Sequence, residues 1–214
     1  MSGAGRGPTG EARLPPDWLP NAILPVSELP AGSALVRVHH RTRSPIFFSP
    51  GGKQPPAGRF DSATGGFGVL YLTFSFEGAF AETVLRNPAR RLVSLGEIAG
   101  RSLAVLALSR AVRLVRMHGA GLQALGVDNA ITTGPYEPCG FWADALFAHP
   151  DRPDGIAYAS RHDPDQLCVA LFSRPDIAIT FAGGSVPLAE ILPEVAAVLR
   201  RYGKGLDDPM TAST

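Results

Sequence analysis

The chain has 214 residues and a formal net charge of +1, with 45% hydrophobic and 18% charged residues. A chain of this length and composition can bury one sizeable core, which excludes wholesale disorder. The near-zero net charge gives no general reason to expect binding to nucleic acid or to an acidic membrane surface, so any binding of anions must come from locally placed arginines.

The residues that most often bind metals or form disulfides have no recognisable spacing. Cys139 and Cys168 form no CxxC pair, so we expect both to be small buried hydrophobes rather than zinc ligands or a disulfide. The histidines show no HExxH or HxH pattern, and no metal is expected. No uninterrupted apolar stretch approaches about 18 residues, so the sequence predicts a soluble protein of the cytoplasm.

The first 32 residues are predicted to form an arm outside the domain. Residues 1–13 are rich in glycine and are expected to be disordered, and residues 14–32 contain five prolines and should run extended over the surface. Their apolar side chains could anchor the arm or bind a partner: Trp18, Leu19, Ile23 and Leu24. The domain is predicted to span residues 33–204, followed by a frayed tail at 205–214.

The first half of the domain combines strands with one long loop. Apolar alternation predicts a strand that begins near Ser33, and residues 41–68 form a Gly-, Pro- and Ser-rich loop of a length that is usually functional. Residues 69–74 are predicted to be a buried strand. Ser75 can then cap a helix over residues 76–85.

Short β-type segments dominate the second half of the domain. Strands are predicted at 92–95, 103–108, 112–115, 156–159, 168–172 and 177–181, and helices at 119–125, 137–148 and 186–202. The strands outnumber the helices and lack a βαβ alternation. The pattern therefore indicates a single α+β domain, with a mixed or antiparallel β core and flanking helices.

Two arginines stand in contexts that suggest an anion site. Arg37 lies on the first apolar strand, and Arg59 follows Gly58 near the end of the long loop. A buried arginine is costly unless an anion or carboxylate pairs with it, and its planar fork suits a phosphate. The alternatives are a structural ion pair for Arg37 and a solvated loop position for Arg59.

Three further polar side chains complete an ordered set. Tyr71 interrupts an apolar strand and could stack on a planar ring, although a core tyrosine would give the same pattern. Glu82 lies on a mostly apolar helix, where a carboxylate could stabilise an oxocarbenium-like ribose; the alternative is a solvent-facing glutamate. Ser160 ends an apolar strand without a GxSxG elbow, so we expect it to bind a substrate by a hydrogen bond. The set suits a site that holds a dinucleotide diphosphate and labilises its glycosidic bond.

The order and context of these residues resemble the RES family, which is named for arginine, glutamate and serine and supplies NAD-degrading toxins of bacterial toxin–antitoxin pairs. The matching stretches cover residues 33–182: ALVRVH, AGRF, VLYLTFSFEGAFAETVLR and GIAYASRHDPDQLCVALF. The resemblance implies a fold similar to ADP-ribosyltransferase toxins. It also implies that NAD+ binds in a cleft as the substrate, with no separate cofactor.

The family's site residues carry over position by position. Arg37 and Arg59 match the arginines that clamp NAD, Tyr71 the stacking tyrosine, Glu82 the catalytic glutamate and Ser160 the serine. The implied reaction is cleavage of the nicotinamide–ribose bond, by hydrolysis or by phosphorolysis with phosphate as co-substrate. Transfer of ADP-ribose to a protein and a catalytically silent binding module are the alternatives.

The resemblance also implies a partner protein. The expected partner is an antitoxin with a helix-turn-helix domain, whose C-terminal part occludes the active site; the sequence does not decide between a monomer and a homodimer.

This chain departs from the family at one loop. The family loop often reads Gly-Arg-Trp-Asn, whereas this chain has Gly58-Arg59-Phe60-Asp61. Phe60 keeps an aromatic surface for the substrate. Asp61 is expected to place an acid beside the diphosphate clamp, which could weaken affinity for NAD or change the group that attacks the ribose.

Overall fold

The computed structural model describes residues 13–53, 55–177 and 179–207. Within these residues, the main sheet has strands β1 (Val26–Leu29), β2 (Ala34–His40), β3 (Val69–Thr73), β5 (Arg101–Leu108), β6 (Val112–Met117), β7 (Gly155–Ala159), β8 (Leu167–Phe172) and β9 (Ile179–Pro187). Their order is β1-β6-β7-β8-β3-β2-β5-β9, and of these neighbours β6 and β7 run parallel while the others are antiparallel. The predicted single α+β domain with a largely antiparallel core is therefore confirmed.

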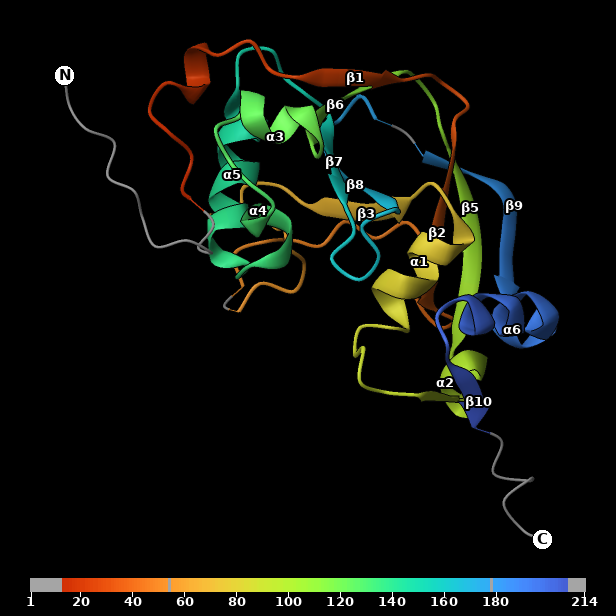
Figure 1. The fold of residues 1–214 in the computed structure, drawn as a ribbon. Helices are drawn as coiled ribbons and strands as arrows, with labels where there is room; N and C mark the ends of the chain where they lie inside the picture. The colour runs from red at the N-terminus through yellow and green to blue at the C-terminus, as the bar shows by residue number, and fades with distance from the viewer. Residues whose placement is uncertain (1–12, 54, 178, 208–214) are drawn as a thin grey trace, which may run out of the picture.

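The helices form two groups at different ends of the sheet (Figure 1). One group, near β6 and β7, consists of α3 (Ala120–Ala124), α4 (Ala130–Thr133) and α5 (Glu137–Ala148). The other consists of α1 (Phe76–Thr83), α2 (Leu95–Ala99) and α6 (Leu192–Arg201), with the small parallel pair β4 (Leu92–Ser94) and β10 (Gly205–Asp207). No helix within the described ranges is long and apolar enough to cross a bilayer.

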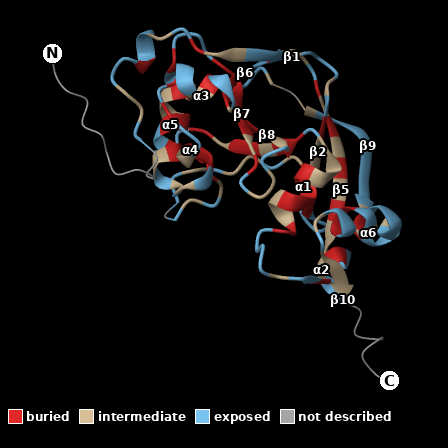
Figure 2. Ribbon diagram, viewed as in Figure 1, coloured by how far each residue is buried: buried red, intermediate tan, exposed pale blue. Residues whose placement is uncertain are grey.

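Each helix group buries its own apolar cluster against the sheet. Trp142 and Leu146 of α5 are fully buried in the cluster that includes β7 and β8, and Phe80 of α1 packs in the cluster that contains Val195 and Leu199 of α6. Buried residues follow the central strands and α5, whereas the edge strand β9 is largely exposed (Figure 2). This division leaves the middle of the sheet available for a site between the groups.

The turn from β3 into α1 forms as its sequence predicts. Ser75 has extended backbone angles, and its hydroxyl accepts a hydrogen bond from the backbone N–H of Gly78 at 3.0 Å, which caps the first turn of the helix. Since α1 follows β3 directly, this cap fixes Glu82 of the helix relative to Tyr71 of the strand.

The N-terminal arm is more integrated than predicted. Residues 1–12 lie outside the described residues, but Leu19 in the 3₁₀ turn η1 (Leu19–Asn21) and Leu24 are buried, and β1 pairs with β6 at the edge of the main sheet. The folded unit thus begins before the predicted boundary at residue 33. Ile23 is almost fully exposed and does not anchor the arm, whereas Trp18 is about half exposed.

The C-terminal part differs from the prediction at two places. β9 continues through Pro187 because it pairs with β5, and a 3₁₀ turn η2 (Leu188–Glu190) separates it from α6. The helix predicted over 186–202 therefore begins later, with Pro193 in its first turn, where the missing N–H is tolerated. The first residues of the predicted frayed tail form β10 beside β4, and residues 208–214 lie outside the described ranges.

Candidate active site

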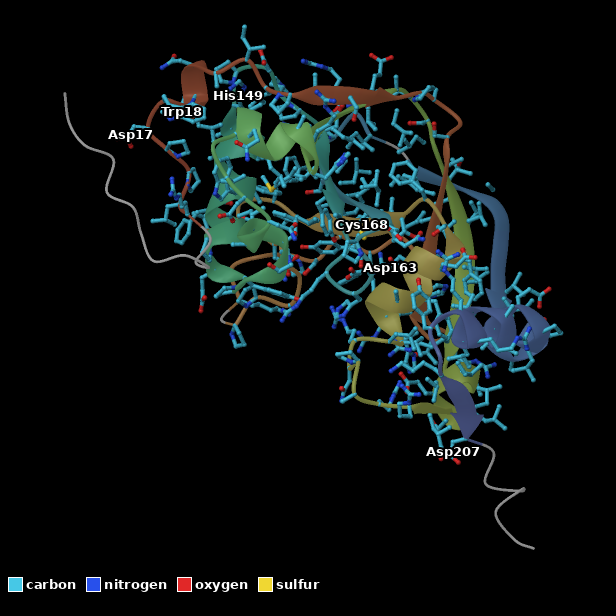
Figure 3. The ribbon with its side chains drawn as sticks, in the orientation of Figure 1. Asp17, Trp18, His149, Asp163, Cys168 and Asp207 are labelled. Atoms are coloured by element: carbon cyan, nitrogen blue, oxygen red, sulfur yellow. The ribbon has the colours of Figure 1, made fainter. Side chains whose placement is uncertain are left out.

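A cleft of about 390 Å³ crosses five neighbouring strands in the middle of the sheet. In sheet order these strands contribute Tyr158, Cys168, Tyr71, Arg37 and Arg101. The long loop adds Arg59 and helix α1 adds Glu82. Cys168 on β8 and Asp163, shortly after β7, mark the middle of the molecule in Figure 3.

Glu82 and Ser160 form the most direct contact of the site. The Ser160 hydroxyl donates a hydrogen bond of 2.6 Å to Oε1 of Glu82, although the two residues are 78 positions apart. Ser160 is 2% exposed, and its oxygen also accepts the backbone N–H groups of His162 and Asp163. Ser160 does not line the cleft, so in place of the expected hydrogen bond to a substrate the structure shows a hydroxyl that holds Glu82.

Arg59 is buried and incompletely satisfied. Its Nη1 donates to the backbone carbonyls of Ile131 and Gly134 at 3.3 and 3.0 Å, and its guanidinium carbon lies 4.4 Å from the centre of the Tyr136 ring. Its Nη2 is buried without a hydrogen-bond partner in the described part of the chain. Because a buried donor without a partner is costly, this atom is suited to an acceptor oxygen of a ligand.

Arg37 contacts backbone rather than an acid. Its Nη1 donates to the carbonyls of Pro45 and Phe47 at 3.0 and 3.2 Å, and no described carboxylate pairs with it. Burial lowers the pKa of Arg37 from its ordinary value, since a charge in a poorly solvated place is disfavoured. The alternative of a structural ion pair does not apply within the described residues, and the guanidinium lines the cleft.

Asp61 ties Tyr71 to the long loop, which corrects the expectation that it stands beside the diphosphate clamp. Its carboxylate accepts the Tyr71 hydroxyl at 2.9 Å, the Ser49 hydroxyl at 2.9 Å and the Gly58 N–H at 2.7 Å. The residue is 3% exposed and does not line the cleft. Burial and then the nearby Asp61 charge raise the pKa of Tyr71 well above its ordinary value. The acid is therefore a structural element of the loop.

Phe60 is placed away from the cleft. Its side chain is completely buried and packs edge-on against Tyr158, with ring centroids 4.9 Å apart. Its backbone N–H donates to the Tyr71 hydroxyl at 2.9 Å. The expectation that Phe60 contacts the substrate is wrong in this structure, because its ring fills the core behind the site while the neighbouring Arg59 turns to the cleft.

Several cleft residues were not singled out from the sequence. They are Arg43, Arg86, Arg101, Tyr136, Arg161 and His162. Each lies at or just beyond the end of a predicted element, where a polar residue is usually solvated, so position alone gave no signal.

Two titratable groups of the cleft have shifted pKa values. Burial lowers the pKa of His162, and the nearby Glu82 opposes that shift. Burial and Glu82 both raise the pKa of Cys168, which keeps this thiol protonated.

The charges of the cleft are strongly unequal. Among the described residues that line it, Glu82 is the only carboxylate, whereas six arginines are present. Such a surface attracts an anionic ligand, while one fixed carboxylate can stabilise positive charge that develops on it. No group of three or more potential ligands within the described ranges is placed to hold a metal ion.

The comparisons with known proteins identify a family and a similar fold. A family model described as the RES domain matches residues 34–187. The fold is similar to the crystal structure of the MbcT–MbcA toxin–antitoxin complex of M. tuberculosis, with a TM-score of 0.59 and 14% identity over 78% of this chain and 90% of that chain. The comparison with curated proteins finds no match. Because the family model covers well over half of the sequence, the chain belongs to the RES domain family.

Proposed function

We propose that this protein consumes NAD+ by cleaving the bond between nicotinamide and ribose. The observation that carries the proposal is the Glu82 carboxylate, held by Ser160 at 2.6 Å in a cleft whose other charged groups are cationic. Membership of the RES domain family supports it. Arg37 and Arg59, which the sequence resemblance matches to the arginines that clamp NAD, both line this cleft.

Each residue has a defined role in the proposed reaction. Arg37 and the Nη2 of Arg59, which has no partner among the described residues, bind the diphosphate, and the ring of Tyr71 stacks on the nicotinamide. The glycosidic C–N bond breaks with its electron pair leaving on nicotinamide, which departs as a neutral molecule and needs no proton. Glu82 stabilises the resulting ribosyl cation.

The acceptor completes the reaction at C1 of the ribose. Water attacks through its oxygen, loses a proton and gives ADP-ribose; phosphate attacks through an oxygen and gives the 1-phosphate of ADP-ribose. Arg86 and Arg161 line the same cleft as Glu82, and their positive charge favours an anionic acceptor such as phosphate. Electrostatic stabilisation dominates, since the leaving group does not require general-acid catalysis.

A toxin role follows as part of the same proposal. The structurally similar MbcT belongs to a complex described as toxin and antitoxin. By analogy of fold, this chain is the toxin of such a pair, and a cognate antitoxin with a helix-turn-helix domain covers the cleft. Growth arrest on expression, relieved by co-expression of the protein encoded next to this chain, is the expected cellular behaviour.

The test is release of nicotinamide from NAD+ by the purified chain, with and without phosphate. The matched control is Glu82→Gln, which keeps the shape of the side chain and removes its charge. Labelled NAD+ added to a lysate separates the alternatives, because transfer to a protein leaves label on a macromolecule whereas hydrolysis and phosphorolysis leave it on small molecules. NAD+ that stays intact under all these conditions would overturn the proposal.

A further inference from the structure

The cleft has a second basic region, which we name the outer basic cluster: His40, Arg43 and Arg101. The cluster forms where the end of β2 meets the start of β5, since His40 and Arg101 face each other in register. The turn after β2 is tied to this place, because the N–H of Arg41 donates to the Gly100 carbonyl at 3.0 Å. The cluster therefore has a defined position in the fold.

A buried histidine holds the turn that carries Arg43. The Nδ1 of His39 lies 3.0 Å from the His40 carbonyl and 3.1 Å from the Arg43 carbonyl, so this nitrogen must carry the proton. Its Nε2 then accepts the hydroxyl of Ser185 on β9 at 3.0 Å. Burial lowers the pKa of His39, in keeping with this neutral state. The side chain of Arg43 is thus presented from a braced turn.

The arginines of the cluster have no acidic partner within the described ranges. Elsewhere in the molecule arginines do pair, as Arg90 does with Glu97 and Arg110 with Asp154, each at 2.7 Å. In the part of the chain that the structure describes, neither Arg43 nor Arg101 is in such a pair, although both line the cleft. Their charge is available to an anion that enters the cleft.

Arg101 of the cluster lies across β2 from the proposed reaction centre. Tyr71 is on β3 and Ser160 follows β7, whereas Arg101 is on β5, with β2 between them. From Arg37 to His40 the strand rises by roughly 10 Å, at about 3.3 Å per residue. Because β2 lies between β3 and β5, a dinucleotide with its diphosphate at Arg37 and its nicotinamide at Tyr71, on the β3 side, has its adenosine half on the β5 side, where Arg101 lies.

We infer that the outer basic cluster binds a phosphate monoester on the adenosine ribose, so that the 2′-phosphorylated dinucleotide NADP+ is a substrate of this cleft. The inference rests on the proposed function for the direction in which the dinucleotide lies. Arginine is suited to such a group because its fork donates two hydrogen bonds to phosphate oxygens. A diphosphate clamp alone does not account for arginines this far along the cleft that have no acidic partner among the described residues.

The first test measures binding, independently of turnover. Calorimetric titration compares ADP-ribose with its 2′-phosphorylated form at about 0.15 M salt, where exposed charges are screened beyond about 8 Å. We expect the wild type to prefer the 2′-phosphorylated ligand by about tenfold or more, the value of one charge-assisted hydrogen bond. Arg101→Gln should bring the ratio of the two dissociation constants towards one.

Two further variants make the result specific. Arg43→Gln changes an exposed residue of the turn and should also reduce the preference, so the test does not depend on the folding of one variant. Arg41→Gln removes the same charge from the same turn at a position that does not line the cleft, and should keep the preference. Equal affinity of the wild type for both ligands, or loss of the preference in Arg41→Gln as large as in Arg101→Gln, overturns the inference.

A turnover assay separates this inference from the proposed function. If nicotinamide is released from NADP+ with a higher kcat/KM than from NAD+, and Arg101→Gln abolishes that advantage, both are supported. If the protein cleaves NAD+ but leaves NADP+ intact, the proposed function stands and the inference fails. If the protein cleaves neither compound, the proposed function fails and so does the assignment of NADP+ as a substrate.

Discussion

The hydroxyl proton of Ser160 can point only to Glu82. The serine oxygen accepts the backbone N–H groups of His162 at 3.0 Å and Asp163 at 3.2 Å, and lies 2.6 Å from the carboxylate. The two backbone donors therefore orient the hydrogen bond from Ser160 to Glu82. In this way the segment that follows β7 positions a side chain of α1. Precise orientation of a charged group before the reaction is a large part of electrostatic catalysis.

We expect Ser160→Ala to lower kcat for NAD+ cleavage by about 10- to 100-fold, the value of one hydrogen bond to a charged group. Glu82→Gln should lower it more, by about 1000-fold, because the charge that stabilises the ribosyl cation is lost. Nicotinamide release measures both effects, and circular dichroism checks folding. Wild-type activity in Ser160→Ala would contradict the positioning role.

Asp61 should be required for stability as well as activity. Asp61→Ala leaves Tyr71, Ser49 and Gly58 without their acceptor, and we expect the free energy of unfolding to fall by about 3 kcal/mol. Asp61→Asn keeps one acceptor oxygen and should cost less. Urea unfolding gives both values. An alanine variant as stable as the asparagine variant would show that the three donors find other partners.

Local signals predicted the elements that depend on local interactions. The helix over residues 137–148 appears with the predicted bounds, and the cap at Ser75 forms as expected. The short strands β1 and β10 were missed, because each depends on pairing with a distant edge and has only a weak apolar pattern. The end of β9 was predicted to be helical from its local pattern, but it is a strand because its pairing with β5 overrides that pattern.

The residues predicted from the sequence for the site divide between the cleft and the structure around it, since Ser160 and Phe60 do not line the cleft. Arg37, Arg59, Tyr71 and Glu82 all line one cleft, which the resemblance had implied. The directions of the consecutive residues Phe60 and Asp61 depend on distant contacts with Tyr158 and Tyr71. A sequence shows that these two residues are neighbours of Arg59, but it does not show that one fills the core and the other closes the loop.

Gly58 should tolerate no side chain. A Cβ atom there would lie 2.4 Å from the ring of Tyr71, so Gly58→Ala must displace the ring or the loop that carries Arg59. We expect a loss of about 1–3 kcal/mol in stability, typical of overpacking, and a strong loss of NAD+ cleavage. Gly66→Ala is the matched control in the same loop, since its nearest neighbour would be 3.5 Å away. If the two variants lose equal stability and equal activity, close packing against Tyr71 is not what requires a glycine at position 58.

Arg59 should act in both folding and ligand binding. Arg59→Met removes the donor to two carbonyl groups and should lower the free energy of unfolding by about 2 kcal/mol. Arg59→Lys keeps the charge but not the planar fork, so it should not restore contact with the diphosphate. Thermal unfolding with ADP-ribose checks this: the ligand should stabilise the wild type and neither variant. Stabilisation of Arg59→Lys equal to that of the wild type would show that the charge alone suffices.

His162 should make stability depend on pH below neutrality. Burial lowers its pKa from the usual 6.5; nearby Glu82 opposes the shift, and Arg86 and Arg161 reinforce it. Between the lowered pKa and 6.5, the unfolded chain binds a proton that the folded chain does not, so the free energy of unfolding falls as the pH falls through this range. We expect the drop between about pH 7.5 and about pH 5.5 to be smaller in His162→Gln than in the wild type. Denaturant unfolding at the two pH values measures it, and equal drops would mean that His162 is protonated as readily in the folded protein as in the unfolded chain.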